Sequence, residues 1–408
     1  MTNKSIEKIQ ELDNQLVAII QDFLLLTPIS WPKESMRVFL KNAASGNLKL
    51  PKIQYPDNNC NDKIDGLKAY LKNLGTSLDP AISFLRDTAE SYLNAYRILQ
   101  GVGTADVSEF SKILYGSPTD ILSGYKRSNI AIAKYFLRIS DAYKLTEDDP
   151  LIYTAHDFKQ KLAKRITQEI KIENDPINIF VDSSIVARVA AGSDYVKIRK
   201  GAMFSNKDLE QLFHHEVMIH TLTYINGRNQ PILKTLGYNA PRTTATQEGL
   251  AVFAEYVNFS IDLVRLKRIA LRIIAINMAE KGADFIDLFK FYRKHSQNDE
   301  ESYYSAMRIF RGGRPEGGIV FYKDNVYLKG LIEVGAFFKQ AMHEGTLHDI
   351  DLIFCGKITT DDVLRLKPLS QEGVITDPKY MPSWAKKSGE LASHLAINDL
   401  TERFKLKR

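Results

Sequence analysis

Cysteine is scarce in this sequence. Two cysteines, Cys60 and Cys355, occur in 408 residues, and no CxxC pair is present. A disulfide scaffold needs a denser set of cysteines, and a thiolate zinc site needs closely spaced pairs, so this count excludes both. We therefore expect a protein of a reducing, intracellular compartment.

Long apolar runs and a strong charge of one sign are also missing. No stretch approaches the roughly 18–20 apolar residues of a membrane span, and the first residues, MTNKSIEKIQELDNQ, are polar where a signal peptide has its apolar core. Lys and Arg exceed Asp and Glu by 55 − 49 = 6, and only the final RFKLKR is a basic cluster. We expect a cytoplasmic protein with no nucleic-acid and no membrane partner.

Apolar side chains are plentiful, with 44% hydrophobic and 10% aromatic residues. This composition suffices for a large buried core and predicts a folded protein. In the first part of the chain, apolar residues recur at i, i+3 and i+4, the pattern of amphipathic helices. We predict a helical N-terminal region over residues 1–165, with helical stretches near 5–26, 65–100, 122–145 and 156–171.

The periodicity changes after this region. Residues 177–182 (INIFVD) and 194–200 (DYVKIRK) are short, β-branched and alternating, which predicts two strands. We expect DYVKIRK to be an edge strand able to pair with an extended peptide. The predicted fold class is α+β, predominantly helical, with a small mixed sheet in a catalytic region over residues 166–408.

Two helix starts are marked by capping residues. Ser205 has an acidic residue three positions later, a variant of the capping box that predicts a helix over about 206–227. Thr244 and Gln247 form the usual capping box and predict a second, long helix that continues to about Gly282. Further helices are expected near 284–295, 298–310 and 328–343.

Histidines concentrate in one place. Three of the eight histidines lie in HHEVMIH, residues 214–220. A zinc hydrolase needs three protein ligands, an open position for water, and a carboxylate beside that water. His215 and His220 are candidate ligands, and Glu216 is the candidate base. The alternative is a buried helix whose histidines are structural.

The spacing of these histidines raises a difficulty. HExxH places its histidines at i and i+4, about 40° apart around a helix, whereas His215 and His220, at i and i+5, are about 140° apart. In a regular α-helix the two side chains would not reach one ion. A π-bulge between them restores convergence, and π-bulges are frequent at functional sites. We therefore predict a π-bulge in this helix.

A second HExxxH string runs from His343 to His348. Gly345 is expected to end the helix over 328–343, which leaves His348 in the following turn rather than on the same helix. We interpret this second copy as a coincidence.

The next helix offers a third ligand. Glu248 lies 28 positions after His220, near a helix start, where an antiparallel helix pair can bring a carboxylate to the histidines. The structural alternative is a carboxylate stabilised by the helix dipole. Glu255, seven residues further on nearly the same face, could orient a histidine or be the ligand itself. We favour Glu248.

These residues resemble a known family. HHEVMIHTLTYINGRNQP followed by TQEGLAVFAEY is similar to the bacterial proteins identified by a QEGLA motif and described as modulators of flavohaemoglobin expression. Their animal relatives are microtubule-associated tyrosine carboxypeptidases, which remove the C-terminal tyrosine of α-tubulin. The resemblance also includes GTADVSEFSKILYGSP, RIFRGGRPEGGIVFYKDNVYLKGL and GVITDPKYMPSW, and so extends over most of the chain.

The resemblance implies a zincin-like metallopeptidase with one Zn²⁺ per chain. Matched by position, the family's zinc ligands correspond to His215, His220 and Glu248, and its catalytic carboxylate corresponds to Glu216. The implied activity is that of a metallocarboxypeptidase that removes tyrosine or another bulky C-terminal residue from a peptide or protein. Tubulin is not expected as a partner if the chain is bacterial.

Further residues are candidates for substrate binding. Tyr327 and Tyr322 could donate a hydrogen bond to the oxyanion, although a tyrosine in such a stretch is more often a packed aromatic. A carboxypeptidase must also bind a terminal carboxylate, which the planar fork of arginine suits best. RIFRGGRPEGG offers Arg308, Arg311 and Arg314. The structural alternative for each is an arginine on the surface or at a helix end.

Two other functions are compatible with the same residues. One is a zinc-binding regulatory protein without peptidase activity, although a structural zinc site has no use for a carboxylate such as Glu216 beside an open coordination position. The other is a zinc endopeptidase, which shares the chemistry and differs in how the end of the substrate is held.

Overall fold

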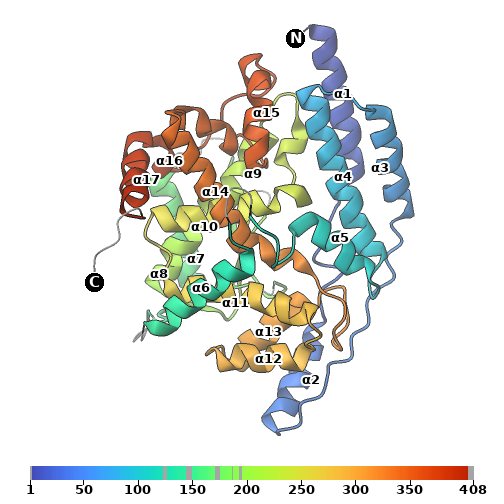
Figure 1. The fold of residues 1–408 in the computed structure, drawn as a ribbon, viewed down its shortest axis with the longest axis vertical. Coiled ribbons are helices and arrows are strands. Elements are labelled where there is room, and N and C mark those ends of the chain that lie inside the picture. Colours follow the sequence, from blue (N-terminus) through green and yellow to red (C-terminus); the bar gives the residue numbers. More distant parts are fainter. Residues whose placement is uncertain are drawn as a thin grey trace.

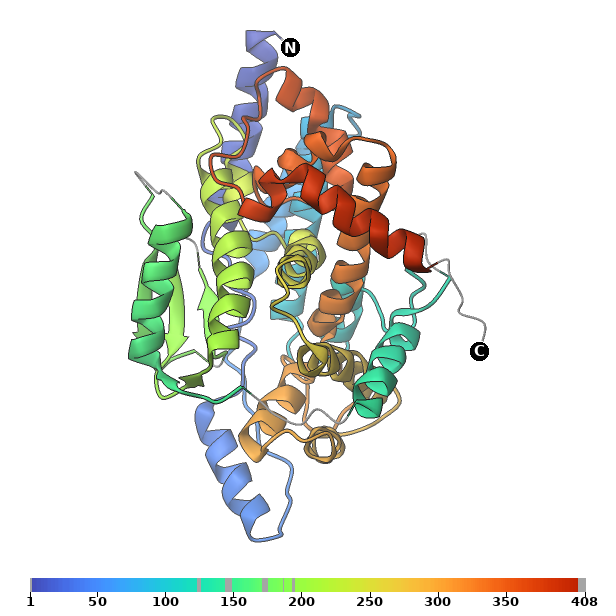
Figure 2. The same ribbon diagram turned by 90° about the vertical axis from the view of Figure 1, so that its left-hand side faces the viewer.

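The computed structural model describes residues 2–122, 126–143, 149–170, 175–185, 187–192 and 195–402. Helices make up most of the structure (Figure 1), and the strands gather at one side of it (Figure 2). The prediction of a predominantly helical chain with a small sheet is confirmed. Within the described ranges, none of the helices is both long and apolar enough to cross a membrane.

The N-terminal region is helical, as expected. It contains α1 (Asn3–Ile20), α2 (Lys33–Ala44), α3 (Asn61–Leu74), α4 (Pro80–Gln100), α5 (Asp106–Tyr115), α6 (Asn129–Ala142) and α7 (Ala155–Glu169). The longest of these, α4, begins where Asp79 accepts hydrogen bonds from two backbone N–H groups and a proline takes the first helical position. The sequence analysis does not predict α2, in which Phe39 is the one buried residue.

The strands are short: β1 (Tyr153–Thr154), β2 (Asn178–Asp182), β3 (Val189–Ala191), β4 (Tyr195–Arg199) and β5 (Met203–Phe204). β1 pairs with β5, and the other three form a sheet in the order β2-β4-β3. β4 is parallel to β2 and antiparallel to β3. The prediction that DYVKIRK is an edge strand is therefore wrong, because β4 is central and both of its edges are paired. β3 takes the edge instead.

The elements that follow the sheet are helical: α8 (Asn206–Leu212), η1 (Phe213–Thr221), α9 (Leu222–Arg228), η2 (Lys234–Gly237), η3 (Pro241–Thr243), α10 (Thr244–Val257), α11 (Leu263–Glu280), α12 (Phe285–Lys294), α13 (Asp299–Ile309), η4 (Tyr322–Asn325), α14 (Val326–His343), η5 (Leu347–Phe354), α15 (Thr360–Gln371), α16 (Ser383–Lys386) and α17 (Ser388–Glu402). The capping box of Ser205 is confirmed. The long helix predicted to continue to Gly282 is wrong, since it is divided into α10 and α11. Phe259, between them, has a φ of 54°, which no α-helix accommodates.

The second predicted capping box, formed by Thr244 and Gln247, is not present in the structure. Thr243 precedes α10, and no side chain caps its first turn. Gln247 does not reach back to the helix start, because its Oε1 accepts hydrogen bonds from Thr223 Oγ1 at 2.9 Å and Lys357 Nζ at 3.0 Å. The side chain that resembled a cap instead connects α10 to the His-bearing helix.

Two apolar clusters support this arrangement. The larger one joins the N-terminal helices to later ones, with Leu16 and Phe84 in the same buried set as Leu250 and Phe338. The smaller one lies between α7, the sheet and η1, and includes Val196 and other residues of β4. The sheet is thus held against the helix that carries the histidines (Figure 2).

Candidate metal centre

The His-rich segment lies in the middle of a continuous helix formed by α8, η1 and α9. Its central part, Phe213–Thr221, is a π-helix, in which hydrogen bonds join residues five apart. His215 and His220 therefore lie one turn apart, and their ring centres are 4.9 Å from each other. The predicted π-bulge is confirmed in the form of a π-helix of nine residues.

Glu248, early in α10, completes the cluster. Its Oε2 lies 3.5 Å from His215 Nε2 and 3.7 Å from His220 Nε2. One donor atom from each of the three residues lies within 4.8 Å of the others, and no other such group of His, Cys, Asp and Glu occurs in the described part of the chain. Two imidazoles and a carboxylate with an open position are the ligand set of a catalytic zinc site, so the residues present fit this metal.

Glu255 lies behind the first histidine. Its Oε1 is 2.7 Å from His215 Nδ1, and Arg265 Nη2 donates to the same oxygen at 3.1 Å. Burial opposes charge on His215, but hydrogen bonds with Glu248 and Glu255 raise its pKa to about 10. Burial also opposes charge on Glu255, but Arg265 and His215 lower the pKa of that carboxyl. Of the two glutamates, Glu248 lies between the histidines, and Glu255 orients one of them.

Glu216, the expected base, is positioned by the sheet. The backbone N–H of Ala191 in β3 donates to its Oε2 at 2.9 Å. Its other carboxylate oxygen accepts no hydrogen bond from the described residues, so that oxygen is available to a water molecule or a proton. The edge strand β3 thus fixes one oxygen of the Glu216 carboxylate and leaves the other oxygen without a hydrogen bond from the described residues.

His214, the remaining histidine of the motif, does not join the cluster. Its ring packs edge-on against Phe213, with 5.2 Å between ring centres. Burial, and then the charge of Arg165, lower its pKa to about 4, so the ring is neutral at physiological pH. His214 therefore has the structural role that was the alternative for the motif as a whole.

Two lysines approach the cluster from elements that the motif does not include. Lys323 Nζ is 3.5 Å from Glu248 Oε1. Lys357 Nζ donates to the backbone carbonyl of His220 at 2.7 Å and to Gln247 Oε1. Burial lowers the pKa of Lys357 to about 7, although the charges of Glu248 and Glu216 oppose that shift. Neither lysine has a sequence signal, because each comes from a segment far from the histidines.

The two candidate tyrosines have different surroundings. Tyr327, at the start of α14, is half-buried, and Lys323 Nζ lies 6.0 Å from its ring centre. Tyr322 is buried, and its hydroxyl donates to Glu280 Oε1 at 2.8 Å. Through Lys323, the structure brings Tyr327 close to the candidate metal ligands, and it gives Tyr322 a different acidic partner.

The three candidate arginines also differ. Arg308 donates from Nε and Nη2 to the two oxygens of Asp324, at 2.6 and 2.5 Å. Arg314 is exposed, and its Nε donates to the carbonyl of Gly103 at 3.1 Å. Arg311 is buried and donates no hydrogen bond to any described residue. Of these three arginines, Arg311 is thus the one that is buried and whose guanidinium donates no hydrogen bond to the described residues.

The second HExxxH string does not form a comparable site. α14 ends at His343, and Gly345 has a φ of 67°, as the sequence predicts for a glycine that ends a helix. The side chain of His343 is half-exposed, and its Nε2 lies 3.5 Å from Asp399 Oδ2. His348 belongs to the next element, η5. The second HExxxH string therefore does not place its two histidines on one helix, as predicted.

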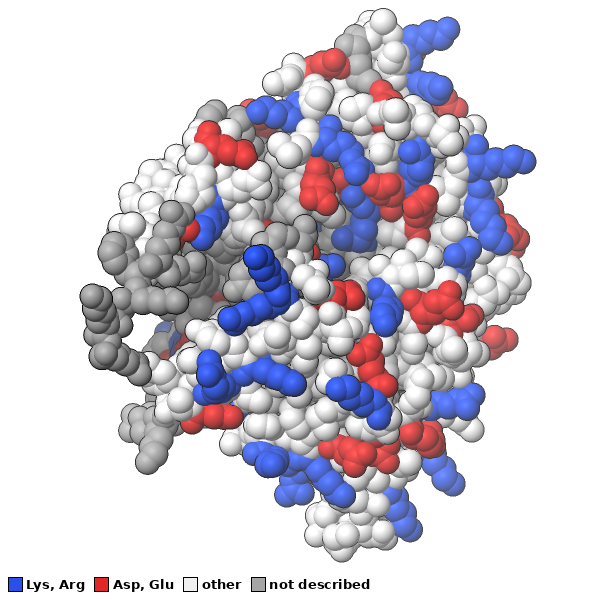
Figure 3. Space-filling model, viewed as in Figure 1, with Lys and Arg blue, Asp and Glu red and all other residues white. Residues whose placement is uncertain are grey.

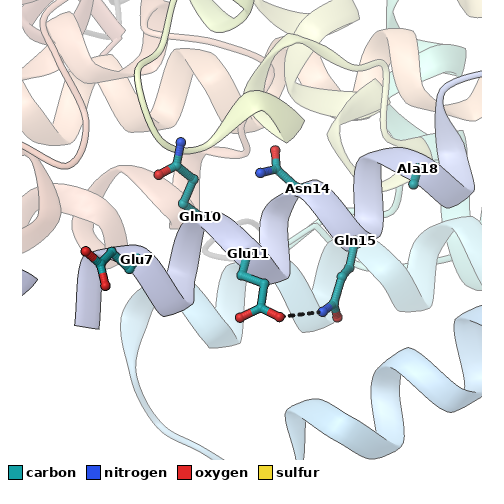
Figure 4. A pocket seen from close by; sticks show the side chains of 6 residues that line it. All are labelled: Glu7, Gln10, Glu11, Asn14, Gln15 and Ala18. Atoms are coloured by element: carbon teal, nitrogen blue, oxygen red, sulfur yellow. Dashed lines mark hydrogen bonds between the residues drawn. The ribbon is translucent and has the colours of Figure 1, made fainter. Parts of the chain in front are cut away.

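One hollow and one face of the surface contrast with the candidate metal centre. Figure 4 shows a shallow hollow lined by one face of α1, with the side chains of Glu7, Gln10, Glu11, Asn14, Gln15 and Ala18. It has no histidine and no second wall, and it lacks the convergent groups of an active site. On the face seen in Figure 3, basic and acidic side chains are interspersed rather than separated.

Comparisons with known proteins cover most of the chain. The profile of the family described as microtubule-associated tyrosine carboxypeptidase (MATCAP) matches residues 38–402. The human and mouse MATCAP2 proteins, each named as a candidate tyrosine carboxypeptidase, are 28% identical over 204 and 200 residues respectively. Each match covers 48% of this chain and 36% of the relative, so the chain spans little more than a third of the length of these curated relatives.

Proposed function

This chain belongs to the family of microtubule-associated tyrosine carboxypeptidases, and on that premise we propose that it is a zinc-dependent carboxypeptidase. It removes one C-terminal residue, tyrosine or another bulky residue, from a peptide or protein. The observation that carries this proposal is the convergence of His215, His220 and Glu248 beside the half-open carboxylate of Glu216. A structural zinc site would have no use for that carboxylate.

The roles of the residues follow from their positions. His215, His220 and Glu248 would hold the zinc ion, which when bound lowers the pKa of water and polarises the scissile carbonyl. Glu216 accepts the proton of the attacking water on its open oxygen and passes it to the amine of the leaving residue. Ala191 keeps the other oxygen of Glu216 in place throughout.

The fold supports a zincin-like arrangement. The histidines lie on a helix packed against a mixed sheet, and the edge strand β3 reaches the base through Ala191. Tyr327 is our candidate for the oxyanion donor, since it lies beside Lys323, which contacts Glu248. Tyr322 is less suited to this role, because its hydroxyl already donates to Glu280.

The substrate is a C-terminus whose carboxylate binds an arginine. Among Arg308, Arg311 and Arg314, the free guanidinium of Arg311 supports this role best. The preference for tyrosine is proposed from the names of the family and its relatives, as nothing in the described residues selects one leaving side chain. The partner is a peptide or protein, and tubulin is not proposed.

The proposal is tested with a peptide library of varied C-termini, incubated with the purified protein with and without a chelator and analysed by mass spectrometry. We expect loss of one C-terminal residue, abolished by the chelator. Glu216→Gln should keep the bound zinc and the melting temperature while hydrolysis falls by on the order of a hundredfold or more.

Other outcomes would identify the alternatives. Cuts well inside the peptides would indicate an endopeptidase. Bound zinc with no cleavage of any peptide would favour a zinc-binding regulatory protein. A Glu216→Gln variant as active as the wild type would remove Glu216 from the role of base.

A further inference from the structure

Arg311 carries a buried positive charge that has no hydrogen-bond or ion-pair partner among the described residues. It is 7% exposed, its guanidinium forms no hydrogen bond or ion pair with the described residues, and its Nε is fully buried. Burial, and then repulsion from Arg308, lower its pKa to about 10, so it is still charged at neutral pH. A buried charge without a partner destabilises a folded protein, and such groups are found where a ligand supplies the partner.

Arg272, on α11, is a second arginine with free donors. Its Nη1 is buried and unbonded, and its Nε lies 4.0 Å from Asp324 Oδ2, at the limit of an ion pair. Asp324 already accepts two short hydrogen bonds from Arg308. The charge of Asp324 also acts on Arg311, so three guanidinium groups share one carboxylate. The excess positive charge belongs to Arg272 and Arg311.

These arginines lie close to the candidate metal centre. The guanidinium carbon of Arg272 is 4.6 Å from the ring centre of Tyr327, and Lys323, which contacts Glu248, is 6.0 Å from the same ring. Arg311 is near enough to Tyr327 for the two to interact electrostatically. Side chains along this path retain solvent access, with exposed fractions of 14% for Glu248, 16% for Lys323 and 21% for Arg272.

We propose that Arg272 and Arg311 together bind the α-carboxylate of the substrate's last residue, while the Arg308–Asp324 pair holds the site rigid without touching the substrate. This inference rests on the proposed carboxypeptidase function. A carboxylate has two oxygens, and two guanidinium groups with free donors can satisfy both of them. Tyr327 lies beside both Arg272 and Lys323, so its ring would border the space for the leaving residue.

The first test compares a peptide that the wild type cleaves with the same peptide amidated at its C-terminus. We expect the free acid to be strongly preferred. Arg272→Gln and Arg311→Gln should each lower kcat/KM for the acid by on the order of a hundredfold, mainly through KM, and should change the slow cleavage of the amide little. Arg268→Gln, on the same helix as Arg272 but with an exposed side chain, is the matched control and should alter neither rate.

The carboxylate could also come from an acidic side chain near the terminus, so a second peptide replaces such residues by glutamine. The kcat/KM for cleavage of this peptide should still fall in Arg272→Gln and Arg311→Gln. If it does not fall in these variants, these arginines bind a side chain and the proposal is overturned. Equal cleavage of acid and amide by the wild type would overturn it too, while leaving the peptidase function intact.

The melting temperature of an Arg311 variant distinguishes a role in substrate binding from a purely structural role of this arginine. Arg311→Met keeps much of the side-chain volume and removes the unpaired charge, so its melting temperature should rise while the preference for the free acid is lost. A fall in melting temperature would assign Arg311 to the structure rather than to the site.

A binding measurement separates this inference from the proposed function. Titration calorimetry of the Glu216→Gln protein with the free-acid peptide should show binding that amidation or Arg272→Gln weakens by on the order of a hundredfold. If no peptide is hydrolysed by the wild type yet this pattern holds, the carboxylate site stands and the proposed catalysis fails. If acid and amide bind equally, the carboxylate site fails.

Discussion

Each candidate metal ligand has a different set of neighbours, which makes its substitution informative. We expect His215→Ala, His220→Ala and Glu248→Ala each to lose most of the bound zinc, because two remaining ligands bind the ion weakly. Glu255→Gln should retain zinc with an affinity about 10–100-fold lower, since it weakens the group that orients His215 without removing one of the three candidate ligands. Zinc content is measured by mass spectrometry of the purified variants.

His343→Ala, in the second HExxxH string, is the control and should leave the zinc content unchanged. Full zinc occupancy in Glu248→Ala together with loss in Glu255→Gln would show that Glu255 is the third ligand, the alternative that the sequence left open.

The protonation of His215 predicts how zinc binding depends on pH. Hydrogen bonds with Glu248 and Glu255 outweigh burial and raise its pKa to about 10, so the metal-free protein carries a proton there at neutral pH. Zinc must displace this proton, and the apparent Kd for zinc should fall about tenfold for each unit of rising pH between about 6 and 9. Competition with a fluorescent chelator measures this slope. A flat profile, or the same slope in Glu255→Gln, would contradict the assignment.

Local patterns in the sequence predicted some of these residues and not others. His215, Glu216 and His220 are adjacent in one helix, and Glu248 follows in the next, so spacing and known zinc chemistry suffice to identify them. Lys357 and Arg272 reach the site from segments more distant in the chain, and a single lysine or arginine has no local signature. Their roles depend on burial and on missing partners, which tertiary packing decides.

At the scale of elements, the spacing of two histidines predicted an irregular helix, because i and i+5 converge only in a π-helical turn. The break between α10 and α11 was missed because apolar residues continue through EYVNFSIDLV. The residue that marks this break is Asp262, the N-cap of α11, whose side chain accepts a hydrogen bond from the backbone N–H of Arg265. The position of β4 in the sheet was missed because β3 is three residues long, too short to show alternation.

The packing of α10 on α14 predicts a further sensitive position. A Cβ atom on Gly249 would lie 2.2 Å from backbone atoms of Gly330, which cannot move aside like a flexible side chain. Gly249→Ala should therefore separate the two helices, destabilise the protein by about 1–3 kcal/mol and shift the adjacent Glu248, weakening zinc binding. Thermal unfolding and zinc affinity together measure this.

Gly335, also on α14, is the matched control. A Cβ there meets no atom within 4 Å, so Gly335→Ala should leave zinc affinity unchanged and stabilise the helix by about 0.5–1 kcal/mol. A Gly249→Ala variant as stable as the wild type would mean that the close approach of α10 and α14 is not required.

At the scale of the whole molecule, the helical N-terminal region and the region that carries the candidate metal centre share buried surface. Trp31, between α1 and α2, packs against Phe285 of α12 with 5.1 Å between ring centres, and its Nε1 donates to Tyr55 at 2.7 Å. Trp384, in α16, packs against Phe253 of α10, the helix that carries Glu248. The division at residue 165 predicted from the sequence remains a prediction, but the larger apolar cluster includes residues from both sides of it.

These two tryptophans are the only ones in the chain, so Trp31→Phe and Trp384→Phe each leave one fluorescent probe, in one region or the other. Because both regions contribute to one core, we expect them to unfold together. In each variant, the urea midpoint from fluorescence should match the midpoint from far-UV circular dichroism of the same protein. Comparing two signals within one variant cancels the stability change that the substitution itself causes. If the Trp31 signal is lost at clearly lower urea than the helical signal, while the Trp384 signal is not, the N-terminal region unfolds on its own and the boundary near residue 165 separates two cooperative units.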